Sequence, residues 1–457
     1  MDLLVRGGTI VNETGQQKAD VLVQNGKIIR LSDCILPVPG MRVIDAHGML
    51  VLPGVIDVHT HYGMVSAGGN RTADDFFQGS ASAACGGVTT IIDYAEPLPG
   101  ESLLEAANKR RQEAEGSIAI DFSLHMVIPR FREGQAAELK ALLDQGISSC
   151  KVFTTYKSLK IDVPDLLRLL KSARDLGVLV TVHAEDDDVI QRAQRRLHEG
   201  GMLAPRYHPA SRPVEAEVQA IKWLVSAAAA QRCPLYFVHV SSGEGCRAIG
   251  QARQEGMRVM GETCPHYLLL TQEKYQSPEA QQYIMSPPLR RQEDIDALWA
   301  GLSSGALQVV ATDHCSYTRE QKQAAATCLD TLPGIPGSET LLPLMYSEGV
   351  GKGRITLGEL VGLLAGNPAR IFGLYPQKGV LAPGSDADMV ILDPYQEVTI
   401  SAQHLHSAAG YTPFEGWQVK GYPVTTILRG RVIYSDGRFS GAQGGGAFIP
   451  AGPGTFQ

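Results

Sequence analysis

The middle of the chain repeats one pattern eight times, and this repeat limits the fold more than any other feature. Each unit is a short run rich in β-branched and aromatic residues, followed by a stretch with helical spacing. Such alternation is typical of βα units, which build a parallel sheet. Eight units close a (β/α)8 barrel, the TIM barrel. The predicted strands are Val55–His59, Thr89–Asp93, Asp121–Met126, Ser149–Phe153, Leu179–His183, Leu235–Val240, Arg258–Glu262 and Leu307–Asp313.

Four of the connections between these strands show apolar residues three and four positions apart, which indicates amphipathic helices. The predicted helices are Pro164–Leu176, Ala216–Ala230, Gly243–Gln254 and Glu293–Leu302.

Both ends of the chain contain short strands and tight turns instead. Asn25-Gly26 between two apolar runs is a strong hairpin signal, and glycine turns near the C-terminus repeat it. We expect the two ends to pair into one small β-sandwich. The predicted domains are a β-sandwich from 1–52 and 378–440, a barrel from 53–377, and a Gly/Pro-rich tail from 441–457 that lies along a surface or a neighbouring subunit.

Composition argues against several classes of function. The 457 residues carry a formal charge of -7 without long runs of one sign, so no basic stripe for nucleic acid and no polybasic membrane patch is present. No apolar run is long enough for a signal peptide or a membrane span, and the eight cysteines form no CxxC pair. We therefore expect a cytoplasmic enzyme that acts on a small molecule and binds neither nucleic acid nor membrane.

Six residues that could hold metal ions lie at or near the ends of separate predicted strands. They are His59, His61, Lys151, His183, His239 and Asp313. In (β/α)8 barrels the chemistry sits at the C-terminal ends of the strands, so strands one, four, five, six and eight would bring these side chains together. Imidazole nitrogens and carboxylate oxygens are the ligands of zinc and related ions. Any one of the histidines could instead bond a backbone carbonyl, and their common placement is what favours a metal site.

Lys151 is the unusual member of this set, because an ammonium group cannot bind a metal. It lies inside an apolar strand, where burial lowers the pKa of a lysine and exposes the neutral amine. A neutral amine can capture carbon dioxide and become a carbamate, which is a two-oxygen anion able to bridge two ions. The alternative is a lysine paired with a nearby acid.

Several longer motifs carry a resemblance to a known family. They are LPGVIDVHTH, CKVFTTYK, VHAED, YHPASRPVEAE, FVHVSSGEG, GETCPHYLLL, SPPLR, ATDHCSY and NPARIFGLYPQKGVLAPGSDADMVILDP. Together they resemble the amidohydrolase superfamily, and within it the D-hydantoinase and dihydropyrimidinase family of cyclic amidases. The resemblance covers nearly the whole chain and is nearest to the bacterial D-phenylhydantoinase branch.

The resemblance implies a centre of two divalent metal ions, with zinc as the expected metal. His59, His61 and Asp313 would hold one ion, His183 and His239 the other, and carbamylated Lys151 would bridge them. It also implies that the Tyr156 phenol donates to the substrate's carbonyl oxygen and that Ser286 binds the ring amide through its backbone. A homotetramer is the assembly that the resemblance implies.

One position departs from the family pattern. In TLPGIPGSE the family usually has asparagine before the first glycine and uses main-chain groups there to hold the ring, but this chain has Pro333. Proline keeps its carbonyl and lacks an N–H group. We therefore expect an altered substrate preference at this position.

The expected function is hydrolysis of the cyclic amide bond of a hydantoin, dihydropyrimidine or related cyclic ureide or imide to an N-carbamoyl amino acid. A hydroxide bridging the two ions would attack, with Asp313 as general base and then general acid. Allantoinase or dihydroorotase chemistry is an alternative, although Gly63 stands where similar dihydroorotases place an arginine. A non-catalytic dihydropyrimidinase-like scaffold is a second alternative, and the presence of all six ligands argues against it.

Overall fold

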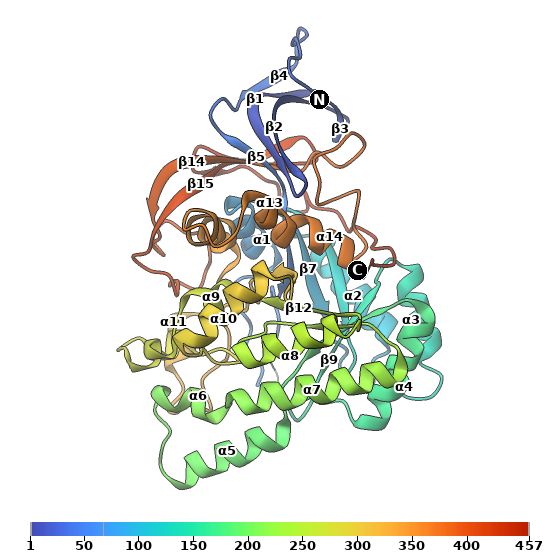
Figure 1. The fold of residues 1–457 in the computed structure, drawn as a ribbon, viewed down its shortest axis with the longest axis vertical. Helices are drawn as coiled ribbons and strands as arrows, with labels where there is room; N and C mark the ends of the chain where they lie inside the picture. Colours follow the sequence, from blue (N-terminus) through green and yellow to red (C-terminus); the bar gives the residue numbers. More distant parts are fainter. Residues whose placement is uncertain (1, 67, 456–457) are drawn as a thin grey trace.

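Eight parallel strands form the centre of the protein, as the computed structural model of residues 2–66 and 68–455 shows (Figure 1). Neighbouring strands follow chain order, and a parallel bridge between Thr60 and His314 joins the end of the first strand to the segment just after the last one. This arrangement confirms the (β/α)8 barrel. The strands are β6 (Val55–Thr60), β7 (Val88–Ala95), β8 (Asp121–Val127), β9 (Ser149–Phe153), β10 (Leu179–His183), β11 (Leu235–Phe237), β12 (Val259–Thr263) and β13 (Val309–Val310).

Two of these strands, β11 and β13, end earlier than the sequence pattern predicts. The backbone turns into the left-handed region at His239, with φ of 38°, and at Asp313, with φ of 49°. A non-glycine residue in this region leaves the extended conformation that a ladder requires. Both residues therefore lie just beyond their strands, on the rim of the barrel.

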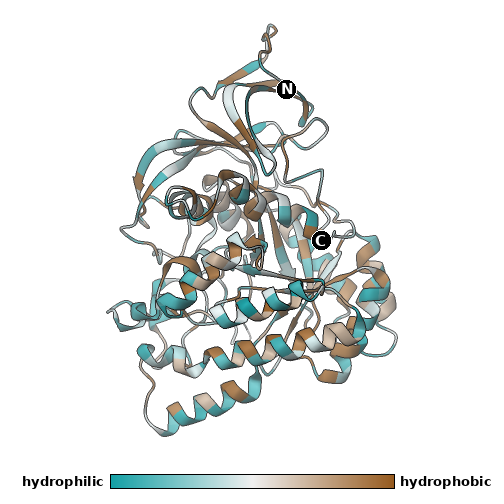
Figure 2. Cartoon of the chain, viewed as in Figure 1, coloured by the Kyte–Doolittle hydropathy of each residue, from teal (hydrophilic) through white to brown (hydrophobic). Residues whose placement is uncertain are grey.

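Helices cover the outside of the barrel, and each of the larger ones carries hydrophobic and hydrophilic residues together (Figure 2). The four predicted helices correspond to α4 (Val163–Leu176), α7 (Val214–Gln231), α8 (Gly243–Gln254) and α10 (Gln292–Ser303). In α4, Asp162 caps the N-terminus by accepting from the Asp165 amide, and Gly177 ends the helix at a φ of 77°. The apolar face of α4, which includes Leu166 and Leu169, is buried.

The remaining helical segments are α1 (Phe76–Cys85), α2 (Leu103–Glu115), α3 (Ala136–Asp144), α5 (Asp187–Glu199), α6 (His208–Ser211), α9 (Pro265–Leu269), α11 (Arg319–Gln323), α12 (Leu341–Leu344), α13 (Leu357–Val361) and α14 (Asn367–Ile371), with short 3₁₀ or π turns at Pro205–Tyr207, Gln272–Gln276, Ala280–Tyr283, Ser338–Thr340, Met345–Val350 and Gly362–Gly366. None of the described helices is both long and apolar enough to cross a membrane.

The two ends of the chain form one second sheet of nine strands, above the barrel in Figure 1. Antiparallel pairing of β5 with β14, from Leu50 opposite Leu392 to Pro53 opposite Met389, joins the N-terminal strands to the C-terminal ones. The strands are β1 (Leu3–Asn12), β2 (Gly15–Gln24), β3 (Lys27–Ser32), β4 (Arg42–Asp45), β5 (Leu50–Pro53), β14 (Met389–Thr399), β15 (Gln418–Leu428), β16 (Arg431–Ser435) and β17 (Arg438–Phe439). The predicted pairing of both ends is present, while the domain limits at 52, 377 and 440 stay predictions.

The tail from residue 441 to 455 packs against the barrel, with part of it buried and part exposed. Its backbone pairs with the start of β8, where Phe122 donates to the Ala447 carbonyl and Ile449 donates to the Phe122 carbonyl. Ile449 and Ala451 are buried in the cluster that fills the N-terminal end of the barrel. A Cβ atom on Gly446 would lie 1.8 Å from the carbonyl oxygen of Ile120, so the close approach needs glycine here.

Candidate active site

A cavity of about 630 Å³ opens at the C-terminal ends of the barrel strands. All nine residues singled out from the sequence line it: His59, His61, Lys151, Tyr156, His183, His239, Ser286, Asp313 and Pro333. The barrel topology explains this convergence, because parallel strands place all their carboxyl ends at one rim.

His59, His61 and Asp313 form the first group of candidate ligands. The Oδ1 atom of Asp313 lies 3.2 Å from the Nε2 atoms of both histidines. Thr60, between them on β6, directs its hydroxyl to Asp93 at 2.9 Å, as the alternation of a strand requires. Burial holds the pKa of His59 well below its usual range, so its imidazole is neutral and has a lone pair available.

His183 and His239 form the second group. Nδ1 of His183 lies 2.9 Å from Nε2 of His239, so the two rings present nitrogen atoms to one point. Burial lowers the pKa of both histidines. The His239 ring also stacks on that of His59, with 5.4 Å between the ring centroids. The two groups of candidate ligands are therefore neighbours in one cavity.

Lys151, at 1% exposure, ends inside the cavity wall on β9. Its Nζ atom lies 5.1 Å from the centroid of the Tyr94 ring and 5.2 Å from that of Phe153. No carboxylate among the described residues forms an ion pair with it, so the alternative of a simple acid-paired lysine finds no support. Burial lowers the pKa of Lys151 to about 8, against the opposing attraction of Glu262 and Asp313. A sizeable share of the amine is therefore neutral near pH 8.

The ligand chemistry fits a pair of divalent ions. Four imidazoles and one carboxylate converge with a buried amine that forms no ion pair with the residues that the structure describes. Burial would raise the pKa of Asp313, but His59 and His61 together with Lys151 hold it well below its usual range, so the carboxylate stays ionised. Deprotonated ligands of this kind are what zinc and similar ions require.

Tyr156, Ser286 and Pro333 lie on the walls beside these groups. Tyr156 adopts a φ of 70°, and its ring centroid lies 5.1 Å from that of His183. Burial raises the pKa of Tyr156 to about 12, against the opposing effect of Arg212, so the phenol keeps its proton and can donate it. Ser286 precedes a cis bond to Pro287, and Pro333 lies on the exposed part of the wall.

Near Ser286 and Pro333, some main-chain groups form hydrogen bonds within the protein and others do not. The Met285 carbonyl accepts from His208 at 2.8 Å, and the Pro287 carbonyl accepts from the Tyr267 hydroxyl at 2.6 Å. Within the described parts of the chain, no donor or acceptor binds the main-chain groups of Ser286, and no donor binds the Pro333 carbonyl. The main-chain groups of Ser286 and the Pro333 carbonyl are therefore available in the cavity, whereas the carbonyls of Met285 and Pro287 are held by hydrogen bonds.

Two carboxylates that the sequence analysis did not single out hold the candidate ligands in place. Glu262, on β12, lies 2.5 Å from Nδ1 of His59 and accepts from the Tyr236 hydroxyl at 2.7 Å. Glu185 lies 2.8 Å from Nε2 of His183 and accepts from Arg212. Such partners fix the orientation of a ligand imidazole and increase its basicity. Glu262 is the acid of GETCPH and lies within the short strand-like run 259–263, so it offered a signal of the same kind as the one used for Lys151.

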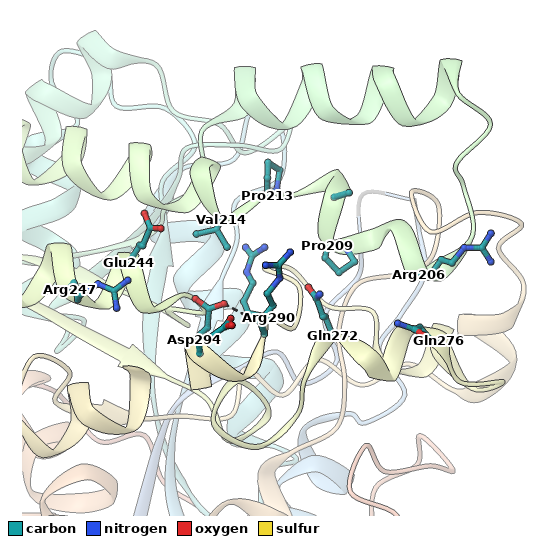
Figure 3. A pocket seen from close by; sticks show the side chains of 13 residues that line it. Arg206, Pro209, Pro213, Val214, Glu244, Arg247, Gln272, Gln276, Arg290 and Asp294 are labelled. Atoms are coloured by element: carbon teal, nitrogen blue, oxygen red, sulfur yellow. Dashed lines mark hydrogen bonds between the residues drawn. The ribbon is translucent and has the colours of Figure 1, made fainter. Parts of the chain in front are cut away.

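A second cavity, of about 590 Å³, lies on the outside of the barrel among α6, α7, α8 and α10 (Figure 3). It contains none of the nine residues. Arg290 at its wall donates to the Ser241 hydroxyl at 3.0 Å and to the Arg212 carbonyl at 2.7 Å. Arg290 thereby braces the segments that follow β11 and precede α7.

Known proteins share this architecture along the full chain. Residues 50–433 match the amidohydrolase family. The D-phenylhydantoinase of Escherichia coli (strain K12) is 42% identical over 453 residues, which make up 98% of each chain. The structure of a dihydropyrimidinase from Brevibacillus agri NCHU1002 superposes with a TM-score of 0.97 at 37% identity, and that of a D-hydantoinase from Bacillus sp. AR9 with 0.95 at 38% identity, both over 100% of each chain. With this barrel, this cavity and these relatives, the chain belongs to the amidohydrolase family, among the hydantoinases and dihydropyrimidinases.

Proposed function

We propose that the chain hydrolyses the cyclic amide bond of hydantoins or dihydropyrimidines to N-carbamoyl amino acids. The observation that carries this proposal is the convergence of buried Lys151, which forms no ion pair within the described part of the chain, with four histidines and Asp313 in one cavity. The names of the relatives, D-phenylhydantoinase, D-hydantoinase and dihydropyrimidinase, point to the same class of substrate.

The candidate ligands divide between two ions, for which zinc is the proposed metal. His59, His61 and Asp313 would hold one ion and His183 and His239 the other, with a carbamate on Lys151 shared by both. Two ions held by these residues would lower the pKa of a water molecule and polarise the ring carbonyl. Glu262 and Glu185 keep His59 and His183 in the orientations that the site needs.

Asp313 is the proposed proton carrier. Its Oδ1 atom faces the two histidines, which leaves Oδ2 to accept a proton from the attacking water and to pass it to the leaving ring nitrogen. The Tyr156 phenol, which keeps its proton, donates a hydrogen bond to the carbonyl oxygen as negative charge develops there.

The free main-chain groups of Ser286 and Pro333 are the proposed contacts to the substrate ring. An amide in the ring has one N–H and one C=O beside the scissile bond, so it needs both an acceptor and a donor from the protein. Ser286 offers both, whereas Pro333 offers only its carbonyl.

Replacing Pro333 with asparagine adds an N–H group at the cavity wall and is expected to change the ranking of substrates. A single hydrogen bond gained or lost is worth about 1 kcal/mol, or roughly fivefold in kcat/KM. The measurement is kcat/KM of both proteins for dihydrouracil, hydantoin and 5-phenylhydantoin. Equal ratios for the three substrates in the two proteins would show that this position does not affect selectivity.

Two other functions make different predictions. Dihydroorotases similar to this chain place an arginine two residues after HxH to bind the ring carboxylate, but here Gly63 stands at that position, and its neighbours Met64 and Val65 line the cavity near His61. These residues favour an apolar ring substituent. A non-catalytic scaffold would bind no stoichiometric metal, so metal analysis of the purified protein separates it from an enzyme.

Cytoplasmic location and a homotetramer remain parts of the proposal, and sedimentation analysis tests the assembly.

The activity itself is tested by loading the protein with zinc in bicarbonate and measuring kcat/KM for dihydrouracil and for D- and L-5-phenylhydantoin. We expect turnover of at least one of these rings and a strong preference for one phenylhydantoin enantiomer. Dominant turnover of dihydrouracil would instead assign the protein to pyrimidine breakdown. If the metal-replete protein opened none of the rings, the proposed function would be wrong.

A further inference from the structure

Lys322 is a second buried lysine beside the cavity, and it does not touch the cavity itself. It lies on α11, has an exposed fraction of 0%, and is absent from the residues that line the cavity. Its position in the chain, nine residues after Asp313, places it in the connection that follows the last barrel strand. Unlike Lys378, which pairs with Asp121 and Asp388 at the other end of the barrel, Lys322 has no carboxylate partner among the residues that the structure describes.

Three backbone carbonyls surround the Lys322 ammonium instead. Its Nζ atom donates to Ile284 at 2.6 Å, to Leu332 at 2.8 Å and to Gly334 at 2.8 Å. An ammonium group has three N–H donors, so this set uses all of them. Burial lowers the pKa of Lys322 to about 7, and the three carbonyl acceptors favour the protonated form, because hydrogen bonds from a charged donor are stronger than those between neutral groups.

The three carbonyls belong to two segments that form one wall of the cavity. One segment contains Met285 and Ser286, and the other contains Leu332, Pro333 and Gly334. The Gly334 amide also donates to the Ile284 carbonyl at 3.0 Å, so the segments meet directly at the point where Lys322 binds them. A single side chain thus joins two segments that are about 50 positions apart in the sequence.

The pattern of bound carbonyls singles out the groups that remain free. Lys322 takes the carbonyls on both sides of Pro333 and leaves that of Pro333 itself. On the other segment, Ile284 is bound by Lys322 and Met285 by His208, while the main-chain groups of Ser286 have no partner in the described chain. Hydrogen bonds therefore hold the neighbours of Ser286 and Pro333 in place and leave the main-chain groups of these two residues available to the proposed ring.

We propose that Lys322 is a positioning residue that clamps these two segments together and so sets the spacing of the Ser286 and Pro333 main-chain groups that grip the substrate ring. The proposal rests on the proposed function, because it assigns to these groups a cyclic amide as their ligand. Lys322 acts through the backbone and makes no contact with the reacting atoms. Its loss is expected to weaken binding of the ring amide, which all the candidate substrates share, rather than to select between ring substituents.

The test compares three variants of the full-length, zinc-loaded protein. Lys322→Met removes the donors and keeps an apolar side chain of similar length, and Lys322→Gln restores two donors on a shorter side chain. Gln323→Met places the same new residue at the next, exposed position of α11 and serves as the matched control. For each variant we would measure kcat and KM for dihydrouracil and hydantoin, metal content, and hydrogen exchange of peptides covering 284–289 and 331–335.

We expect Lys322→Met to raise KM for both substrates by about tenfold or more with a smaller change in kcat, because charged hydrogen bonds that hold the binding groups are lost. In Lys322→Met, hydrogen exchange in both peptides should become faster and metal content should stay the same. The KM and the exchange rates of Lys322→Gln should lie between those of Lys322→Met and those of the parent protein. Gln323→Met should match the parent protein in all four measurements.

Unchanged KM in Lys322→Met, with or without a loss of thermal stability or faster exchange, would overturn the proposal and leave Lys322 a purely structural residue. If Lys322→Met does not fold, Lys322→Gln decides: parent-like KM and exchange overturn the proposal, and a shift of both supports it. A parent protein that opens no cyclic ureide would refute the proposed function. In that case, hydrogen exchange that stays slow in both Lys322→Met and Lys322→Gln would also refute the role of Lys322 in holding the two segments together.

Discussion

Replacing Lys151 with alanine is expected to remove both the bound metal and all measurable hydrolysis. Lys151 is the one candidate ligand that both groups of ligands would share, and neutral water could not supply the bridging anionic charge that its carbamate would provide. Without a bridging anion, two cations held close together in the cavity would repel each other. The measurements are metal content by elemental analysis and kcat/KM for the preferred ring after reloading with zinc and bicarbonate.

Rescue by small acids makes this prediction specific. The alanine variant leaves a space at the end of β9, and short carboxylates such as acetate or propionate can supply the two-oxygen anion that the carbamate would provide. Activity and metal content should therefore return in part as the acid is added. Lys157→Ala, an exposed lysine in the connection after β9, is the control and should behave like the parent protein. A Lys151→Ala protein that kept its metal and full turnover would end the bridging assignment.

Replacing Asp313 with asparagine is expected to slow hydrolysis by several orders of magnitude while much of the metal stays bound. An amide oxygen can still lie near His59 and His61, but an amide cannot accept and return a proton at neutral pH. General acid–base catalysis typically contributes about a hundredfold to ten-thousandfold, and this is the loss expected in kcat. Single-turnover rates measured with metal content on the same samples check it.

The two possible causes of such a loss give different data. If Asp313 only binds the metal, activity in Asp313→Asn should fall in proportion to metal content and recover at high zinc concentration. If Asp313 carries the proton, the rate per bound metal should be low at every zinc concentration. Parent-like turnover per metal would exclude Asp313 from proton transfer.

Much of the fold could be predicted from the sequence because its signals are local. A strand that is buried on both faces, such as Leu179–His183, appears as a continuous apolar run of the right length, and its limits agree with β10. Helix limits follow from residues such as Asp162 and Gly177, whose capping roles depend only on nearby backbone. The ligands at strand ends were identifiable because the barrel topology sends every strand end to one rim.

The ends of β11 and β13 were not predictable in this way. His239 and Asp313 stand in runs that the sequence pattern predicts as strand, but both adopt positive φ values and contact residues of neighbouring strands. The His239 amide donates to Glu262, and Asp313 faces His59 on β6 and His61 just after it. Such conformations depend on residues far away in the sequence, so local propensity does not reveal them.

The sequence by itself determined the eightfold βα alternation, the pairing of the two chain ends and the set of side chains at the rim, since periodicity and strand-end position are written locally. Only the tertiary structure decided which groups hold these side chains in place: Glu262 contacts His59, and Glu185 contacts His183. It also decided that Lys322 anchors the segments of Ser286 and Pro333 and that the tail packs at the N-terminal end of the barrel. The physical reason is that a hydrogen bond between residues 203 positions apart, as between His59 and Glu262, exists only after the strands have assembled, and no periodicity along one chain encodes such a distance.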